Sequence, residues 1–101
     1  MVTAPFFVAT KLDAFKGRGK GDWFGSRDLE DLVSVVDGRA TLVSEVRAEA
    51  VALSAYVRSE INRLLRAAKF VDALPGYLLA DAVSQSRITI ILQRLEQLAT
   101  M

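Results

Sequence analysis

Cysteine and histidine are both absent from this 101-residue sequence. Their absence excludes disulfides, thiolate zinc sites, nucleophilic cysteine, and every mechanism that uses imidazole as a base or a metal ligand. A metal ion would have to be held by carboxylates, which favours magnesium or manganese. Any chemistry must therefore rest on lysine, arginine, aspartate and glutamate, and we assign no metal site and no catalytic residue to the chain alone.

The sequence also lacks long apolar runs and a large charge excess. No stretch approaches the roughly 20 apolar residues that a membrane span requires, and no secretory signal is visible at the N-terminus. The 13 basic and 12 acidic residues leave a net charge of +1, so no global field attracts nucleic acid or a membrane surface. We therefore expect a cytoplasmic protein with no membrane partner and no strong nucleic-acid signal.

The residues that are present favour packed helices. Hydrophobic residues make up 51% of the chain and charged residues 25%, which is the range of a globular domain, and the length suits one domain, residues 1–101. Apolar positions recur mostly at helical spacing. We predict an all-α fold, a small bundle of four to five helices. The N-terminal MVTA could instead form a short extended segment.

Local signals place the first two helices. Pro5 suits the first turn of a helix that runs to about Phe15 and ends near Gly17. The glycine-rich segment 16–26, KGRGKGDWFGS, is typical of a loop, in which we expect the two aromatic side chains, Trp23 and Phe24, to pack inward. Ser26 is a good N-cap for a second helix that ends at Gly38.

The longest periodic stretch begins at Thr41 or Ser44 and continues to about Lys69. As one straight helix of about 26 residues it would measure about 39 Å, whereas a domain of this length has a radius of gyration of about 13 Å. The stretch must therefore bend, break near residues 48–50, or project and pack against a partner.

The C-terminal third is predicted as shorter pieces. Residues 70–74 add a turn, Pro75-Gly76 breaks the chain, and Asp81 or Ser84 caps a last helix that continues to about Leu98. The β-branched run at residues 88–91 could be a strand on propensity alone. Its continuation at helical spacing into QRLEQL favours a helix.

Candidate chemistry lies between residues 9 and 37, ATKLDAFKGRGKGDWFGSRDLEDLVSVVD. Glycines let a backbone approach a phosphate closely, and lysine or arginine neutralises it. We therefore regard four basic residues as candidate nucleotide-binding residues, with a solvated basic loop as the alternative: Lys11, Arg18, Lys20 and Arg27.

Asp28 and Asp31 are three residues apart and share one face of their helix. The two carboxylates could hold magnesium, or they could orient Lys11 through an ion pair, so both are candidate site-supporting or metal-adjacent residues. In the alternative interpretation Asp28 complements the helix dipole and Asp31 pairs with Arg27.

At these residues the chain resembles a known family. PFFVATKLDAFKGRGKGDWFGSRDLEDLVSVVDGR is similar to the second half of nucleotidyltransferase-fold proteins related to the AbiEii abortive-infection toxins, and DALPGYL and SQSRITIILQRLEQLA are similar to the tail of that family. The resemblance implies that Lys11 contacts the nucleotide phosphates and that Asp28 and Asp31 support the site. Arg27 stands where many relatives have histidine or lysine.

The resemblance also shows a departure. The G-G-x-x-[LV]-x-x-G and D-x-D patterns that supply the family's metal-binding carboxylates do not occur here. It therefore implies a truncated or split nucleotidyltransferase-like protein that is inactive alone and needs no cofactor by itself. Mg²⁺ and an NTP would be bound only with a catalytic half. The alternative is a non-enzymatic helical interaction or oligomerisation module of a toxin–antitoxin-like locus, with an antitoxin-like partner.

The missing half leads to a prediction about self-association. In the resembled family the first helix packs against the catalytic sheet. Exposing a large apolar side chain forgoes roughly 1.5 to 3 kcal/mol, so we expect the uncovered residues to find another surface. We predict a homodimer built from the N-terminal helix, the helix at 44–69, or both. The N-terminal residues concerned are Phe6, Phe7, Val8, Leu12 and Phe15.

Overall fold

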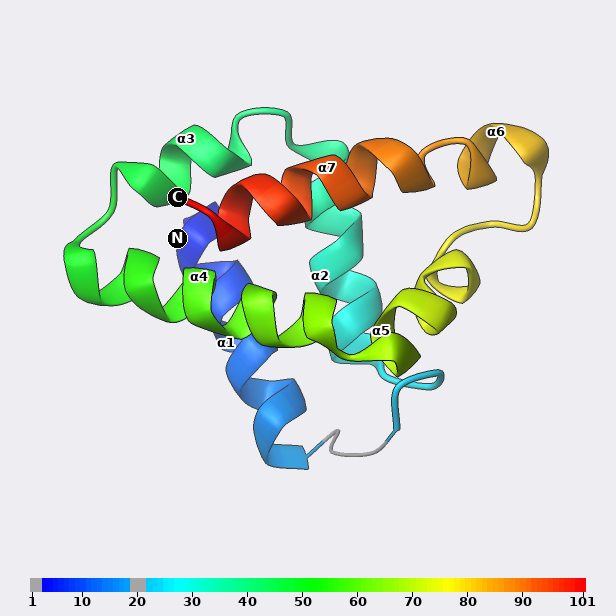
Figure 1. Cartoon of the computed structure of the whole chain (residues 1–101), viewed down its shortest axis with the longest axis horizontal. Coiled ribbons are helices and arrows are strands. Elements are labelled where there is room, and N and C mark those ends of the chain that lie inside the picture. Colours follow the sequence, from blue (N-terminus) through cyan, green and yellow to red (C-terminus); the bar gives the residue numbers. More distant parts are fainter. Residues whose placement is uncertain (1–2, 19–21) are drawn as a thin grey trace.

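The computed structural model describes residues 3–18 and 22–101, without the side chain of Arg18. Every regular element in that part of the chain is helical, as predicted (Figure 1). The helices are shorter and more numerous than the four to five expected. In chain order they are α1 (Ala4–Arg18), α2 (Arg27–Gly38), α3 (Leu42–Arg47), α4 (Val51–Arg66), α5 (Ala68–Ala73), the 3-10 helix η1 (Leu74–Tyr77), α6 (Ala82–Gln85) and α7 (Ile88–Ala99).

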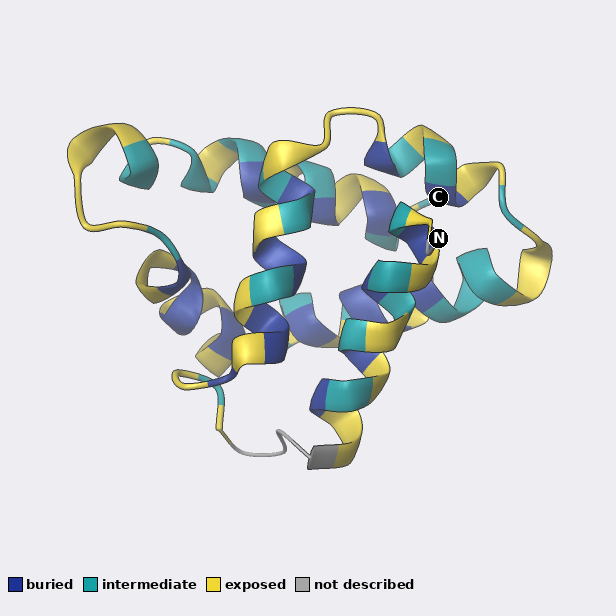
Figure 2. Ribbon diagram, turned by 180° about the vertical axis from the view of Figure 1, so that it is seen from behind, coloured by how far each residue is buried: buried dark blue, intermediate teal, exposed yellow. Residues whose placement is uncertain are grey.

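Helix α1 lies against α2 and α4, and Figure 2 shows buried, intermediate and exposed residues in turn along the helices. Val8, Leu12 and Phe15 are buried in the common core, whereas Phe6 is 54% exposed and Phe7 is partly buried. The expectation that all five apolar residues of this helix lack cover is therefore wrong. Two helices of the same chain bury the face that was expected to need a sheet or a partner.

The periodic stretch from Thr41 or Ser44 to Lys69 is divided into α3 and α4. The break lies near residues 48–50, which was one of the three alternatives predicted from the sequence. Helix α3 ends at Arg47, and Ala50 takes an extended conformation (φ −53°, ψ 147°) before α4 begins at Val51. The break lets Val46 and Ile61 enter one core within a molecule of 37 × 28 × 27 Å. No single helix spans residues 44–69, so the element proposed there as part of a dimer interface is divided into α3 and α4.

The C-terminal third contains one more interruption than predicted. The side chain of Asp81 accepts a hydrogen bond from the Ser84 N–H (2.7 Å) and caps only the short α6. The side-chain amide of Gln85 donates to the carbonyls of Pro75 (3.0 Å) and Leu79 (2.9 Å), which ties this helix to the preceding turn. A turn then separates α6 from α7, so the prediction of one continuous last helix is wrong.

Helix α7 includes residues 88–91, and the choice of helix over strand for this β-branched run is confirmed. The helix buries Ile91, Leu95 and Leu98 and packs on α4 and α2. Tertiary burial of one apolar stripe outweighs the weak strand propensity of the run.

Two arginines, Arg94 of α7 and Arg87 just before that helix, hold the C-terminal end of α2. Arg94 donates to the carbonyls of Val36 (3.0 Å) and Asp37 (2.6 Å). Arg87 donates to the Asp37 carboxylate (2.8 Å). Cations at a helix C-terminus complement its dipole and satisfy its last carbonyls. The predicted end of α2 at Gly38 is confirmed, and side chains 50 to 58 residues further along the chain hold it.

Among the residues that the structure describes, no helix combines the length and the apolar character needed to cross a membrane.

Candidate functional site

The predicted site residues Lys11, Asp28 and Asp31 meet at the contact between α1 and α2. The Lys11 ammonium lies 2.9 Å from the nearer oxygen of Asp31 and 3.7 Å from that of Asp28. It also lies 5.3 Å from the centre of the Phe7 ring, one turn earlier on α1, which is within the range of a cation–π contact. Residues separated along the chain by the glycine-rich loop thus form one cluster.

The position of the two carboxylates follows from the start of α2. The Ser26 hydroxyl accepts a hydrogen bond from the Leu29 N–H (3.2 Å), which confirms the predicted N-cap. Asp28 therefore lies in the first turn, where a negative charge complements the helix dipole. Asp31 follows one turn later on the same face. Leu29 and Leu32 are buried, so the core sets the rotation of α2 that presents both carboxylates to α1.

The cluster is only partly open to water. The side chains of Lys11 and Asp28 are 22% and 10% exposed, and that of Asp31 is 36% exposed. Of the sequence alternatives, the structure contains the ion pair that orients Lys11. The Lys11 ammonium occupies the position beside both carboxylates. Asp31 forms its ion pair with Lys11 and not with Arg27, which was the partner in the alternative interpretation.

Of the other three candidate phosphate ligands, the structure describes the side chain of Arg27, which forms no ion pair with the cluster. Arg27 is exposed at the start of α2. The side chain of Arg18 and all of Lys20 lie outside the described residues. Helix α1 continues to Arg18, so Lys16 belongs to its last turn and not to the loop where the sequence placed it.

Trp23 and Tyr77 anchor the described end of the loop. The Trp23 ring is partly buried against Phe15, with ring centres 5.0 Å apart, and the Tyr77 hydroxyl donates to the Trp23 carbonyl. Burial, and secondarily the charge of Asp22, raises the pKa of Tyr77 to about 12. Phe24 is 69% exposed, so its predicted inward packing is wrong.

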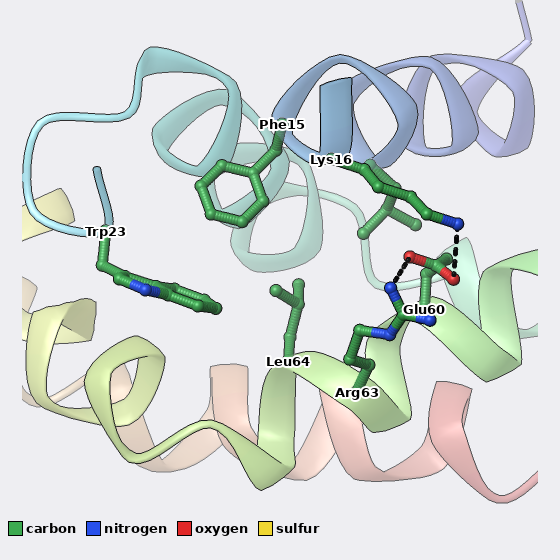
Figure 3. Close-up of a pocket in the computed structure, with 7 residues that line it drawn as sticks. Phe15, Lys16, Trp23, Glu60, Arg63 and Leu64 are labelled. Carbon is green, nitrogen blue, oxygen red and sulfur yellow. Dashed lines mark ion pairs between the residues drawn. The ribbon is translucent and has the colours of Figure 1, made fainter. Parts of the chain in front are cut away.

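A cavity of about 360 Å³ lies between α1, the loop at Trp23 and α4 (Figure 3). Its apolar wall consists of Leu12, Phe15, Trp23 and Leu64, and its charged residues are Lys16, Glu60 and Arg63.

The three charged residues of this cavity form one ion-pair group. Glu60 is buried, with 8% of its surface exposed. The Lys16 ammonium lies 3.7 Å from one carboxylate oxygen of Glu60, and the Arg63 guanidinium lies 3.8 Å from the other. In Figure 3 both cationic side chains extend toward this carboxylate.

Sequence reasoning missed this cavity, although one signal was present. Glu60 stands in the buried stripe of α4, between Val57 and Leu64 and beside Ile61. A carboxylate within such a stripe needs a partner, because an unpaired buried charge is costly. Arg63, three residues later on the same helix, is a partner that the spacing allows, whereas Lys16 could not be identified as one without the packing of α1 on α4.

The part of the chain that the structure describes brings together no group of three or more histidine, cysteine, aspartate or glutamate side chains suited to a metal ion. Comparisons of the chain with protein-family models, with curated proteins and with solved structures found no significant match. The functional argument therefore rests on the residues and their geometry.

Proposed function

We propose that the chain is the helical half of a split or truncated nucleotidyltransferase-like protein, which binds nucleotide phosphates at Lys11 together with a catalytic half and is inactive alone. The observation that supports this proposal is the meeting of Lys11 with Asp28 and Asp31 at 2.9 and 3.7 Å. These are the residues to which the sequence resemblance assigns the phosphate contact and its support. They come from two helices joined by the basic loop.

The geometry suits a lysine that is oriented before a phosphate arrives. An ammonium has three N–H donors, and its contacts with Asp28 and Asp31 use at most two of them. The Lys11 side chain is 22% exposed, so a phosphate oxygen can reach the remaining donor. A polyphosphate carries more charge than a carboxylate and can compete with Asp31 for the same lysine.

The metal-binding carboxylates belong to the catalytic half in this proposal. Phosphoryl transfer with metal ions needs carboxylates that converge on the metal, whereas Asp28 and Asp31 converge on Lys11. We expect no detectable nucleotide transfer when the purified chain is assayed with each common NTP and magnesium. Robust transfer that disappears in Lys11→Ala would overturn this assignment.

Binding is tested by isothermal titration with magnesium–ATP at low salt. Lys11→Gln should weaken binding about tenfold, because a hydrogen bond to a charged group contributes about 1.5 kcal/mol or more. Lys69→Gln is the matched control, since Lys69 is an exposed lysine on α5. Equal affinities of wild type and Lys11→Gln would remove this site from consideration.

Asp31→Asn separates a binding role of Lys11 from a purely structural one. If Lys11 binds phosphate, removal of the competing carboxylate should tighten ATP binding. If Lys11 only clamps α1 to α2, the variant should lose a few tenths of a kcal/mol to about 1 kcal/mol of stability, as exposed ion pairs do, with no gain in ATP affinity.

The second candidate is a non-enzymatic helical module that forms a homodimer or binds an antitoxin-like protein. The 54% exposure of Phe6 on α1 favours this alternative, because a large aromatic side chain remains in water there. Phe7 lies beside Lys11 and is partly buried, so Phe6 is the better residue to change.

Sedimentation equilibrium at high micromolar concentration tests the dimer. A dimer built on α1 should shift toward monomer in Phe6→Asp but not in Val51→Asp, which alters an exposed apolar residue at the start of α4. A wild-type mass of 11.1 kDa would exclude the homodimer.

A further inference from the structure

We infer that the cavity between α1 and α4 binds a small organic anion, a carboxylate with an aromatic or branched apolar body. This inference does not depend on the proposed function, because the cavity and the Lys11 cluster share no residue. It rests on the combination of a concave apolar wall and two cations held at its edge by a buried carboxylate (Figure 3).

The apolar wall determines the body of the ligand. A volume of about 360 Å³ lies near the lower end of the range of about 300–1,000 Å³ found for small-molecule sites. Phe15 and Trp23 stand at 56° to each other with ring centres 5.0 Å apart. Phe15 and Trp23 present aromatic surface, and Leu12 and Leu64 present aliphatic surface. A ligand with one aromatic ring could pack against both kinds of surface.

The charged residues determine the head group. The side chains of Lys16 and Arg63 are 49% and 64% exposed, so the two cations lie toward the solvent while Glu60 is buried. Their ion pairs with Glu60 measure 3.7 and 3.8 Å, which is longer than the roughly 2.7–3.2 Å of an N–H···O hydrogen bond. Both cations therefore retain donors for a carboxylate that enters from solvent.

Glu60 positions the two cations, and its place behind them disfavours a cationic ligand. Its carboxylate draws Lys16 and Arg63 to the same place beside the cavity. The three side chains together carry a formal charge of +1, and the two accessible ones are positive. A ligand ammonium would meet Lys16 and Arg63 before it reached Glu60, whereas a carboxylate would be attracted at the entrance.

The single tryptophan of the sequence lines this cavity, so its fluorescence reports binding directly. The probes are 4-phenylbutyrate and its neutral amide, which has the same apolar body without the charge. We expect a saturable change in Trp23 fluorescence with the carboxylate and at least about threefold weaker binding of the amide, because one or two charge contacts are lost. No change at millimolar carboxylate, or equal affinity for the amide, would overturn the inference.

Charge variants locate the head group. Arg63→Gln should weaken carboxylate binding by about threefold or more, whereas Arg66→Gln, which removes an exposed arginine of the same helix outside the cavity, should not. Circular dichroism verifies that both variants are folded. Equal losses of carboxylate affinity in the two variants would indicate general charge attraction and would contradict binding in this cavity.

A second readout is independent of tryptophan. In methyl-resolved NMR, 4-phenylbutyrate should shift the signals of Leu12 and Leu64 and leave those of Leu79, which is exposed near α6, unchanged. Shifts confined to other methyl groups would contradict binding in this cavity.

Discussion

The role of Arg94 in holding the end of α2 leads to a prediction about stability. Its guanidinium donates to the carbonyls of Val36 and Asp37 at 3.0 and 2.6 Å, and these contacts join α7 to α2. The substitution Arg94→Met keeps an unbranched apolar stem of similar length at this half-buried position. It removes only the donors and the charge.

The magnitude follows from the two hydrogen bonds. A hydrogen bond to a charged group contributes about 1.5–3 kcal/mol to stability, and a cation at a helix C-terminus contributes about 0.3–1 kcal/mol. Both bonds share one guanidinium nitrogen and are partly buried, so they should not be added in full. We expect Arg94→Met to lower the free energy of unfolding by about 2 kcal/mol.

Urea unfolding and thermal melting, followed by circular dichroism, test this value. A loss of about 2 kcal/mol corresponds to a decrease in Tm of about 8–16 °C for a domain of this size. Arg66→Met is the control, because Arg66 is exposed on α4. An Arg94→Met variant within about 0.5 kcal/mol of wild type, the range of an ordinary surface substitution, would refute the reasoning.

Two further predictions concern the loop and the helix that follows it. Ser26→Ala removes the N-cap of α2 and should lower the free energy of unfolding by about 1 kcal/mol, as measured by urea unfolding. The control is Ser59→Ala, which alters an exposed serine of α4. A loss no larger than that of the control would contradict the capping role. Tyr77→Phe removes the hydroxyl that donates to Trp23 and should cost about 1 kcal/mol near neutral pH. Because the folded pKa of Tyr77 is raised to about 12 from an unfolded value of about 10, the wild type keeps this proton-linked stability below about pH 10 and loses it as the pH rises toward 12. The stability difference between wild type and Tyr77→Phe should therefore shrink over that pH range, and a constant difference would contradict the assignment.

The sequence alone determined the features that depend on neighbouring residues. Helical periodicity predicts an all-α fold, Ser26 and Gly38 mark the ends of α2, and the three-residue spacing of Asp28 and Asp31 places both carboxylates on one helix face. Each of these signals acts within one or two turns of the backbone. For the long periodic stretch the sequence indicated a break near residues 48–50 only as one of three alternatives, because nothing local at Ala48 or Ala50 forces the chain to turn.

The tertiary structure decided the features that depend on residues far apart in the chain. It shows that Lys11 pairs with Asp28 and Asp31, that α2 and α4 bury one face of α1, and that Arg94 donates to carbonyls at the end of α2. It also brings Lys16 to Glu60 and places the residues of α1, Trp23 and α4 around the cavity. These contacts arise from how the helices rotate and pack to bury their apolar stripes in one core, and no local propensity encodes that packing.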